Sequence, residues 1–354
     1  MKATDVFKDE SFIECLKKET YDDNNIHIEI FNKKNEIIEK RINKVTYIDC
    51  SNYWIINIEG IHIFKNLKKL KLSDNKIKKI PNKIGKLKNL KELFLIYNQI
   101  EEIPKEIWNL NNLEILDLFF NQIKEIPKEI GELINLKILN LSYNKIKKLP
   151  KEIGKLINLE ELSLENNKLQ YLPNEIGNLK KLEKLNLSSN QIEKLPKKIS
   201  GLKNLEVLLL NSNQIEEIEE ILKKIWNLKK LEKLKLSHNK IKKIPKEIEK
   251  LENLKEIYLG YNQLQWLLKE ILELNKLKKV WLYKAFKLDD LKQEPKNLLD
   301  ILKKLKDNNV FDDFDLYYLK KEVYPILEKK IKRKYKIDDL KNFKDDLNLD
   351  NFIF

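Results

Sequence analysis

Residues 67–89 read LKKLKLSDNKIKKIPNKIGKLKN, and the next 23 residues, LKELFLIYNQIEEIPKEIWNLNN, repeat the same pattern. The frame LxxLxLxxNxIxxIPxxIGxLxx recurs from there with a 23-residue period and few changes. A fixed period of this kind indicates a repeat architecture, in which each copy buries its apolar side against its neighbours. In each copy, one asparagine follows the LxL segment, three positions after its last leucine. These residues are Asn75, Asn98, Asn121, Asn144, Asn167, Asn190, Asn213, Asn239 and Asn262.

Each copy predicts a short strand followed by a return segment. The LxL segment alternates with period two, which is typical of a strand with one buried face. Successive strands should form a parallel sheet with a spacing of about 4.8 Å. The return segment is longer than the strand, so the stack should bend with the strands on the inside. Each asparagine should turn inward, where its amide can bond backbone groups of the bend.

The pattern resembles the leucine-rich repeat family, in particular its class of 23-residue repeats with a proline after the consensus isoleucine or leucine. The resemblance covers residues 45–283. It implies an α/β fold, a solenoid with a curved parallel sheet on its concave face and helical or irregular segments on its convex face. It also implies that the nine asparagines form a structural ladder. A repeat at fixed spacing is specific for fold but not for function.

The ends of the repeat array divide the chain into three predicted parts. Residues 1–44 should form an N-terminal cap, with a helix over 10–20 and a β-hairpin that turns at residues 32–35. Residues 45–283 hold one degenerate repeat, nine full repeats and one partial repeat. Residues 284–354 should be helical, and they are a cap, a small domain or a partner-binding appendage.

Three helices are expected in this C-terminal part. The first covers residues 295–307 and starts with a proline at its first helical position. The second covers residues 313–336 and is interrupted or kinked near Pro325. A third is expected within residues 338–349.

One stretch breaks the repeat. Residues 213–228 read NQIEEIEEILKKIWNL, with no proline and three extra residues. The apolar residues follow helical spacing, and glutamates precede lysines as the helix dipole favours. Three residues are close to one helical turn. The stretch therefore predicts one added turn on the convex side, with an inward stripe of Ile218, Ile221, Leu222, Ile225 and Leu228.

The net charge of +14 comes almost entirely from lysine, because Arg41 and Arg333 are the only arginines. Arginine supplies the bidentate fork that phosphates and guanine edges favour, whereas lysine is a flexible point charge. The composition therefore argues against a nucleic-acid partner and favours a solvated lysine face. Binding of nucleic acid or an acidic partner by the lysine-rich first and eighth repeats stays open as an alternative.

Cysteine usage and the N-terminal sequence favour the cytoplasm. The two cysteines, Cys15 and Cys50, give no disulfide framework. Cys15 should be a small buried hydrophobic residue of the N-terminal helix. No apolar run approaches the ~18 residues of a membrane span, and the first residues contain no signal-peptide core. Export by a route that needs no cleaved signal is the alternative.

The sequence contains no recognisable enzyme motif. It has no phosphate loop, no HExxH and no CxxC, and its histidines (His27, His62 and His238) adjoin no cysteine pair. Some bacterial relatives carry a ubiquitin-ligase domain with a catalytic cysteine, but no cysteine follows Cys50 here. Others carry a GTPase module, which requires a phosphate loop. We therefore expect no catalytic activity, no metal and no cofactor.

The strand positions that face away from the core carry the clearest functional signal. Most copies place small or polar residues there, but the second to fourth copies place a contiguous apolar and aromatic set. An exposed set with aromatic anchors is typical of a protein interface. We predict a non-enzymatic protein–protein interaction scaffold that binds a partner on its concave face. The predicted contact residues are Phe94, Ile96, Tyr97, Ile115, Asp117, Phe119, Phe120, Ile138, Asn140 and Tyr143.

Some features leave alternatives open. Tyr97, Phe120 and Tyr143 flank the strand ends and can instead fold over the loops. A second aromatic cluster should be buried by the C-terminal helices, and those helices are an alternative partner site of a regulatory module. Trp108 and Trp226 are expected as convex packing or surface residues, and His238 as an exposed residue. The second cluster consists of Tyr258, Tyr261, Trp266, Trp281 and Tyr283.

Overall fold

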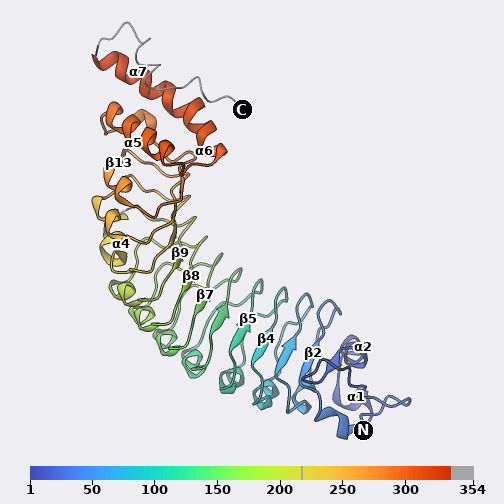
Figure 1. The fold of residues 1–354 in the computed structure, drawn as a ribbon. Coiled ribbons are helices and arrows are strands. Elements are labelled where there is room, and N and C mark those ends of the chain that lie inside the picture. The colour runs from blue at the N-terminus through green and yellow to red at the C-terminus, as the bar shows by residue number, and fades with distance from the viewer. Residues whose placement is uncertain (217, 336–354) are drawn as a thin grey trace. The chain divides into compact units, whose positions relative to one another are not determined.

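The structure is a computed structural model that describes residues 1–216 and 218–335 (Figure 1). The chain forms two compact units. Unit 1 consists of Met1–Gln191 and Pro196–Leu205, and unit 2 of Ile192–Leu195 and the chain from Glu206 onward. The third predicted C-terminal helix lies outside the described residues.

The strands of unit 1 follow one another in chain order, and from β2 on they are parallel. Leu116 lies opposite Leu139, so the pairing register equals the sequence period. Short β1 pairs antiparallel with β2. The predicted α/β repeat solenoid is thereby confirmed. The strands are β1 (Thr20–Tyr21), β2 (Tyr47–Asp49), β3 (Lys69–Lys71), β4 (Glu92–Phe94), β5 (Ile115–Asp117), β6 (Ile138–Asn140), β7 (Glu161–Ser163) and β8 (Lys184–Asn186).

A row of short 3₁₀ helices forms the return side of unit 1, visible as a second set of turns beside the strands in Figure 1. From η2 on, a proline precedes each helix, because its fixed φ suits a helix start and no N–H is lost there. The third residue of each of these helices is a buried isoleucine that faces the leucines of the strands. The helices are η1 (Ile61–Ile63), η2 (Asn82–Lys86), η3 (Lys105–Asn109), η4 (Lys128–Glu132), η5 (Lys151–Lys155), η6 (Asn174–Asn178) and η7 (Lys197–Gly201).

Buried asparagines join neighbouring repeats. Asn144 Oδ1 accepts a hydrogen bond from the Ile123 N–H at 2.9 Å, and its Nδ2 donates to the carbonyls of Leu118 at 3.0 Å and Leu141 at 3.1 Å. The other eight consensus asparagines are buried and have the same kind of partners. One side chain thus bonds backbone groups of its own repeat and of the preceding one.

A second, exposed row of asparagines was missed by the sequence analysis. Asn135 Nδ2 donates to the Asn111 carbonyl at 2.8 Å, 24 residues earlier. Equivalent bonds come from asparagines at the ends of five other copies. The signal was present in the sequence, because most copies end in asparagine.

The N-terminal cap differs in part from the prediction. The expected helix is α2 (Glu10–Lys18), after a short α1 (Ala3–Val6). The predicted turn is present, because the Asn32 N–H donates to the Glu36 carbonyl at 2.9 Å and the Ile38 N–H to the Ile30 carbonyl at 2.8 Å. The second arm is shorter than predicted, because α3 (Glu39–Ile42) begins directly after it. Asp9 attaches the cap to the first repeat. Its Oδ1 accepts from the Phe12 N–H at 3.0 Å, and its Oδ2 accepts from the Ile56 N–H at 2.7 Å.

Cys15 and Cys50 form a disulfide, which corrects the expectation that the cysteines give no crosslink. Cys15 belongs to α2 and Cys50 directly follows β2, and both are fully buried. Their Cα atoms are 5.5 Å apart, within the usual disulfide range. The sequence could not show the pair, because only the packing of α2 against β2 brings the two residues together.

Unit 2 continues the repeat with one longer copy. The predicted extra turn is confirmed as α4 (Ile218–Ile225), an α-helix where other copies have five-residue 3₁₀ helices. Ile221, Ile225 and Leu228 are buried, whereas the side chains of Ile218 and Leu222 lie outside the described residues. The Ile215 N–H still donates to Asn239 Oδ1 at 3.1 Å, so the asparagine bonding continues past the insertion. The other elements are β9 (Val207–Leu209), β10 (Lys233–Lys235), β11 (Lys243–Ile244), η8 (Lys246–Lys250), β12 (Glu256–Tyr258), β13 (Trp266–Leu267), η9 (Lys269–Glu273) and β14 (Lys279–Trp281).

The C-terminal helices cover the edge of β14. The order is η10 (Leu288–Asp290), α5 (Pro295–Asp307), α6 (Asp313–Tyr318), the π-helical turn η11 (Leu319–Val323) and α7 (Tyr324–Tyr335). α5 has the predicted bounds. The predicted interruption near Pro325 is η11, which ends two residues before this proline, because proline has no N–H for a regular α-helical bond. The Val280 N–H donates to the Val310 carbonyl at 2.9 Å, and the Leu282 N–H to Asp315 Oδ1 at 2.8 Å.

Replacement of Asn144 by leucine should lower the free energy of unfolding by at least ~2 kcal/mol, because several buried backbone groups lose their partner at about 1–3 kcal/mol each. Urea unfolding measures this effect. Asn135→Ala is the matched control and should change the value by less than about 0.5 kcal/mol, because Asn135 is exposed. If the two variants lowered the free energy of unfolding equally, the buried asparagines would not stabilise the fold more than the exposed ones do.

Asp315 should make the stability of unit 2 depend on pH. Burial raises its pKa to about 7, and the nearby Asp312 carboxylate adds to the rise. In the unfolded chain an aspartate titrates near 3.9. Between these values the folded state holds more protons, so stability is full at low pH and falls as pH rises toward about 7. Asp315→Asn removes the titration. The wild type should therefore lose up to about 3 kcal/mol relative to Asp315→Asn between about pH 5 and about pH 8. Urea unfolding followed by tryptophan fluorescence tests this, and a pH-independent difference would contradict it.

Candidate protein-binding surface

Ten residues of unit 1 form one surface, which we call the aromatic patch. They lie on β4, β5 and β6 or in the residues that follow these strands. Leu93, Leu116 and Leu139 point into the core, so strand alternation turns their neighbours outward. None of the ten is fully buried, and the two most exposed are Tyr97 at 45% and Phe120 at 47%. The patch consists of Phe94, Ile96, Tyr97, Ile115, Asp117, Phe119, Phe120, Ile138, Asn140 and Tyr143.

Four rings from three adjacent repeats are in contact. The Phe119 ring lies 5.4 Å from Tyr97, 6.2 Å from Phe120 and 5.0 Å from Tyr143, measured between centroids. Tyr97 and Phe120 are 4.7 Å apart. These tilted and edge-on arrangements are the favoured ones for aromatic pairs. The repeat spacing therefore assembles a continuous aromatic cluster from residues that are 23 positions apart.

Three of these rings are held by an unusual backbone geometry. Tyr97, Phe120 and Tyr143 have φ values of 50°, 55° and 56°, in the left-handed region. Equivalent residues of other repeats share it, for example Asn166 at 51°. This region disfavours bulky residues and suits asparagine. The backbone therefore does not require aromatic residues here. Tyr97 and Phe120 are exposed and do not fold over the loops, whereas Tyr143 is half-buried.

Asp117 and Asn140 place polar groups inside the patch. They lie opposite each other on β5 and β6. Asp117 Oδ1 accepts a hydrogen bond from the Phe119 N–H at 3.0 Å, and Asn140 Oδ1 accepts from the Ser142 N–H at 3.1 Å. Burial raises the pKa of Asp117 above its ordinary value, and the bonds from Phe119 and Asn140 only partly oppose this. The side chains of Asp117 and Asn140 therefore offer hydrogen-bond acceptors to a bound protein, and apolar side chains surround them.

Charged residues at the margin of the patch are paired. Lys69 bonds Glu92 at 2.7 Å and lies 5.6 Å from the centre of the Phe94 ring. On the other side, Glu161 lies 3.6 Å from Lys184. The margins therefore add little unpaired charge, and the patch presents mainly apolar area.

The second aromatic cluster is less buried than predicted. Tyr261 is 37% exposed, and Tyr258, Trp266, Trp281 and Tyr283 are half-buried. The prediction was wrong for Tyr261, because α6 reaches only the end of the cluster. There the Tyr283 ring lies 4.7 Å from Phe314 and 5.3 Å from Tyr318.

His238, Trp108 and Trp226 lie in the environments that the sequence predicted. His238 is exposed, and its ring stacks on Tyr261 at 4.1 Å. Trp108 is fully buried in the return row, and Trp226 is half-buried with the Lys250 ammonium 4.1 Å from its ring.

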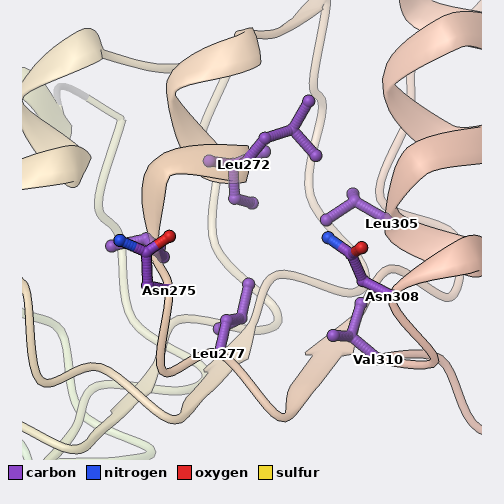
Figure 2. Close-up of a pocket in the computed structure, with 8 residues that line it drawn as sticks. Leu272, Asn275, Leu277, Leu305, Asn308 and Val310 are labelled. Carbon is purple, nitrogen blue, oxygen red and sulfur yellow. The ribbon is translucent and has the colours of Figure 1, made fainter.

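A cleft of about 310 Å³ separates η9 from α5 (Figure 2). None of its eight lining residues titrates, so the cleft offers no acid or base. In the described residues, no group of three or more His, Cys, Asp or Glu could hold a metal ion. The same part of the chain contains no helix long and apolar enough to cross a membrane. The lining residues are Ile271, Leu272, Leu274, Asn275, Leu277, Leu305, Asn308 and Val310.

Several solved structures resemble this chain. A leucine-rich repeat protein of Leptospira interrogans is 29% identical over 86% of this chain and 85% of its own, with a TM-score of 0.60. The functional domain of InlJ from Listeria monocytogenes is 22% identical over 78% of this chain and 55% of its own, with a TM-score of 0.64. An internalin, InlF, of the same species is 19% identical over 88% and 92%, with a TM-score of 0.63. No curated protein sequence matches.

Family models match most of the repeat array. A model described as leucine-rich repeat region matches residues 105–187 and 151–221. A leucine rich repeat model matches residues 65–123, and a model of two leucine rich repeats matches residues 229–269. Together with the strand register and the buried asparagines, these matches show that the chain belongs to the leucine-rich repeat family.

Proposed function

We propose that this protein is a non-enzymatic scaffold that binds a protein partner through the aromatic patch. The observation that carries the proposal is a contiguous cluster of four aromatic rings at the ends of β4–β6, two of them exposed and two half-buried, at positions that most other repeats of unit 1 fill with small or polar residues. Aromatic anchors of this kind contribute most of the binding energy at protein interfaces. The family and the internalin-like neighbours are consistent with an interaction scaffold.

The patch would accept an apolar segment of the partner. Tyr97, Phe119 and Phe120 offer ring faces and edges, and the contacts of the Phe119 ring with Tyr97 and Phe120 restrict the positions of the side chains. A fixed side chain loses less conformational entropy on binding. Asp117 would accept a hydrogen bond from a donor in the centre of the interface. This arrangement would set the register of the bound segment.

The lysines of the first repeat give little support to a nucleic-acid function. Lys71 pairs with Asp49 at 3.3 Å, and Lys69 pairs with Glu92. Both ammonium groups already have carboxylate partners. A phosphate backbone would have to replace those pairs.

The double variant Phe94→Ser with Phe119→Asp should reduce partner recovery in a pull-down at least tenfold, because it removes two anchors and places a charge in the patch. The matched control is Lys71→Ser with Ser163→Asp, which changes the same strand position on both sides of the patch. It should leave recovery unchanged. Circular dichroism checks that both variants fold. If the first variant folds and recovers the partner fully, the aromatic patch is not the binding site.

The disulfide indicates the kind of compartment in which the protein binds its partner. Disulfides persist in oxidising compartments and are rare in the cytosol. We therefore propose that the chain acts in an oxidising compartment, in contrast to the cytoplasm favoured by the sequence alone.

Protein isolated under alkylation from its native source should show no reactive thiol after unfolding without reductant. After reduction it should show two. Mass spectrometry of the alkylated peptides that contain Cys15 and Cys50 measures this. Two alkylated thiols before reduction would contradict the proposed compartment.

A further inference from the structure

A second surface, in unit 2, is not used by the proposed function. Its rings form a continuous row from β10 through β12 and β14 to α6. The His238 ring stacks on Tyr261, which lies 6.0 Å from Trp281 and 5.3 Å from Tyr283. The row ends at Phe314, which is 58% exposed. We call His238, Tyr258, Tyr261, Trp281, Tyr283 and Phe314, with Lys235 and Lys284, the C-terminal aromatic surface.

This surface carries unpaired positive charge, unlike the aromatic patch. The Lys235 ammonium lies 4.6 Å from the centre of the Tyr258 ring. The Lys284 ammonium lies 5.4 Å from Tyr283 and 5.8 Å from Tyr261. Within the described residues, neither lysine has a carboxylate at ion-pair distance. The two cations are therefore held beside apolar rings and remain available to a carboxylate.

Two neighbouring lysines, Lys233 and Lys279, already form ion pairs with carboxylates. Lys233 bonds Glu256 at 2.9 Å, and Lys279 bonds Asp312 at 3.1 Å. Glu256 also accepts from the Tyr258 hydroxyl at 2.9 Å. Lys235 and Lys284 are therefore the lysines of this surface that form no ion pair in the described residues. Lys235 is the last residue of β10, and Lys284 directly follows Tyr283.

We propose that the C-terminal aromatic surface binds an acidic segment of a partner protein, one that combines carboxylates with leucine or aromatic side chains. The carboxylates form charge-assisted hydrogen bonds to Lys235 and Lys284, which are stronger than bonds between neutral groups. The apolar side chains pack on Tyr261, Trp281 and Phe314. Charge complementarity and exposed aromatic area both point to this occupant.

The ring geometry disfavours single-stranded nucleic acid as the occupant. Bases bind such surfaces by stacking on free aromatic faces. Here His238 and Tyr261 cover each other's face, and Lys235 lies over Tyr258. The cations are lysines, which lack the fork that arginine offers to phosphate.

The test is selection of a random twelve-residue peptide library, displayed on phage, on the full-length protein. The selected peptides should be enriched in Asp or Glu together with Leu, Phe, Tyr or Trp. Their recovery should fall at least tenfold on Lys235→Gln with Lys284→Gln, and also on Tyr261→Ser. The matched control is Lys246→Gln with Lys269→Gln, at exposed lysines of η8 and η9 in the same unit. This control should leave recovery unchanged.

Two results would overturn the proposal. One is that the peptides whose binding is lost on Tyr261→Ser show no acidic enrichment, or bind the Lys235→Gln with Lys284→Gln variant as well as the wild type. The other is that a labelled twenty-residue oligothymidine binds more tightly than the selected peptides and loses affinity with the same variant. Circular dichroism confirms that each variant is folded. Because the substitutions lie in unit 2, a loss of binding on these variants separates the peptides of this surface from peptides that bind the aromatic patch in unit 1.

Discussion

The hydrogen bonds of the buried asparagines are the constraint on which the structure depends. The chain must bend sharply after each strand, and the bend leaves backbone N–H and C=O groups without partners inside the core. Asn98, for example, bonds the Ile77 N–H and the Leu72 carbonyl, both in the preceding repeat. Each repeat is thereby fixed to the one before it, and the register of the sheet equals the sequence period.

The same bend positions the functional surfaces. The residue before each asparagine has a left-handed backbone, so its side chain stands at the strand end next to its counterparts in neighbouring repeats. In unit 1 this row includes Tyr97 and Phe120, and in unit 2 it includes His238 and Tyr261. A structural requirement of the fold thus creates rows of side chains, and the choice of residues in those rows provides the chemistry. Unit 1 offers a mainly apolar surface, whereas unit 2 adds free lysines.

The sequence predicted those features that the 23-residue period determines. The strands, the inward asparagines and the helical turn of α4 all follow from local spacing. The Cys15–Cys50 disulfide could not be predicted, because it depends on how a non-repeated helix packs against β2. The same reason explains why the second arm of the N-terminal hairpin is shorter than predicted. For the candidate site, strand alternation predicted that Phe94 and Phe119 point outward, but the partial exposure of Tyr261 depends on how far α6 reaches, which no local pattern encodes.

Site-specific photo-crosslinking tests the central claim most directly. A benzophenone amino acid at position 119 lies within the aromatic patch, and one at Ile157 lies on the return side of the same unit, at a residue that is 58% exposed. Each protein is irradiated in an extract of the organism that produces it. A partner that crosslinks from position 119, is absent at position 157 and is competed by unlabelled wild-type protein is the predicted result. Crosslinking of the same partner from position 157 but not from position 119 would contradict it.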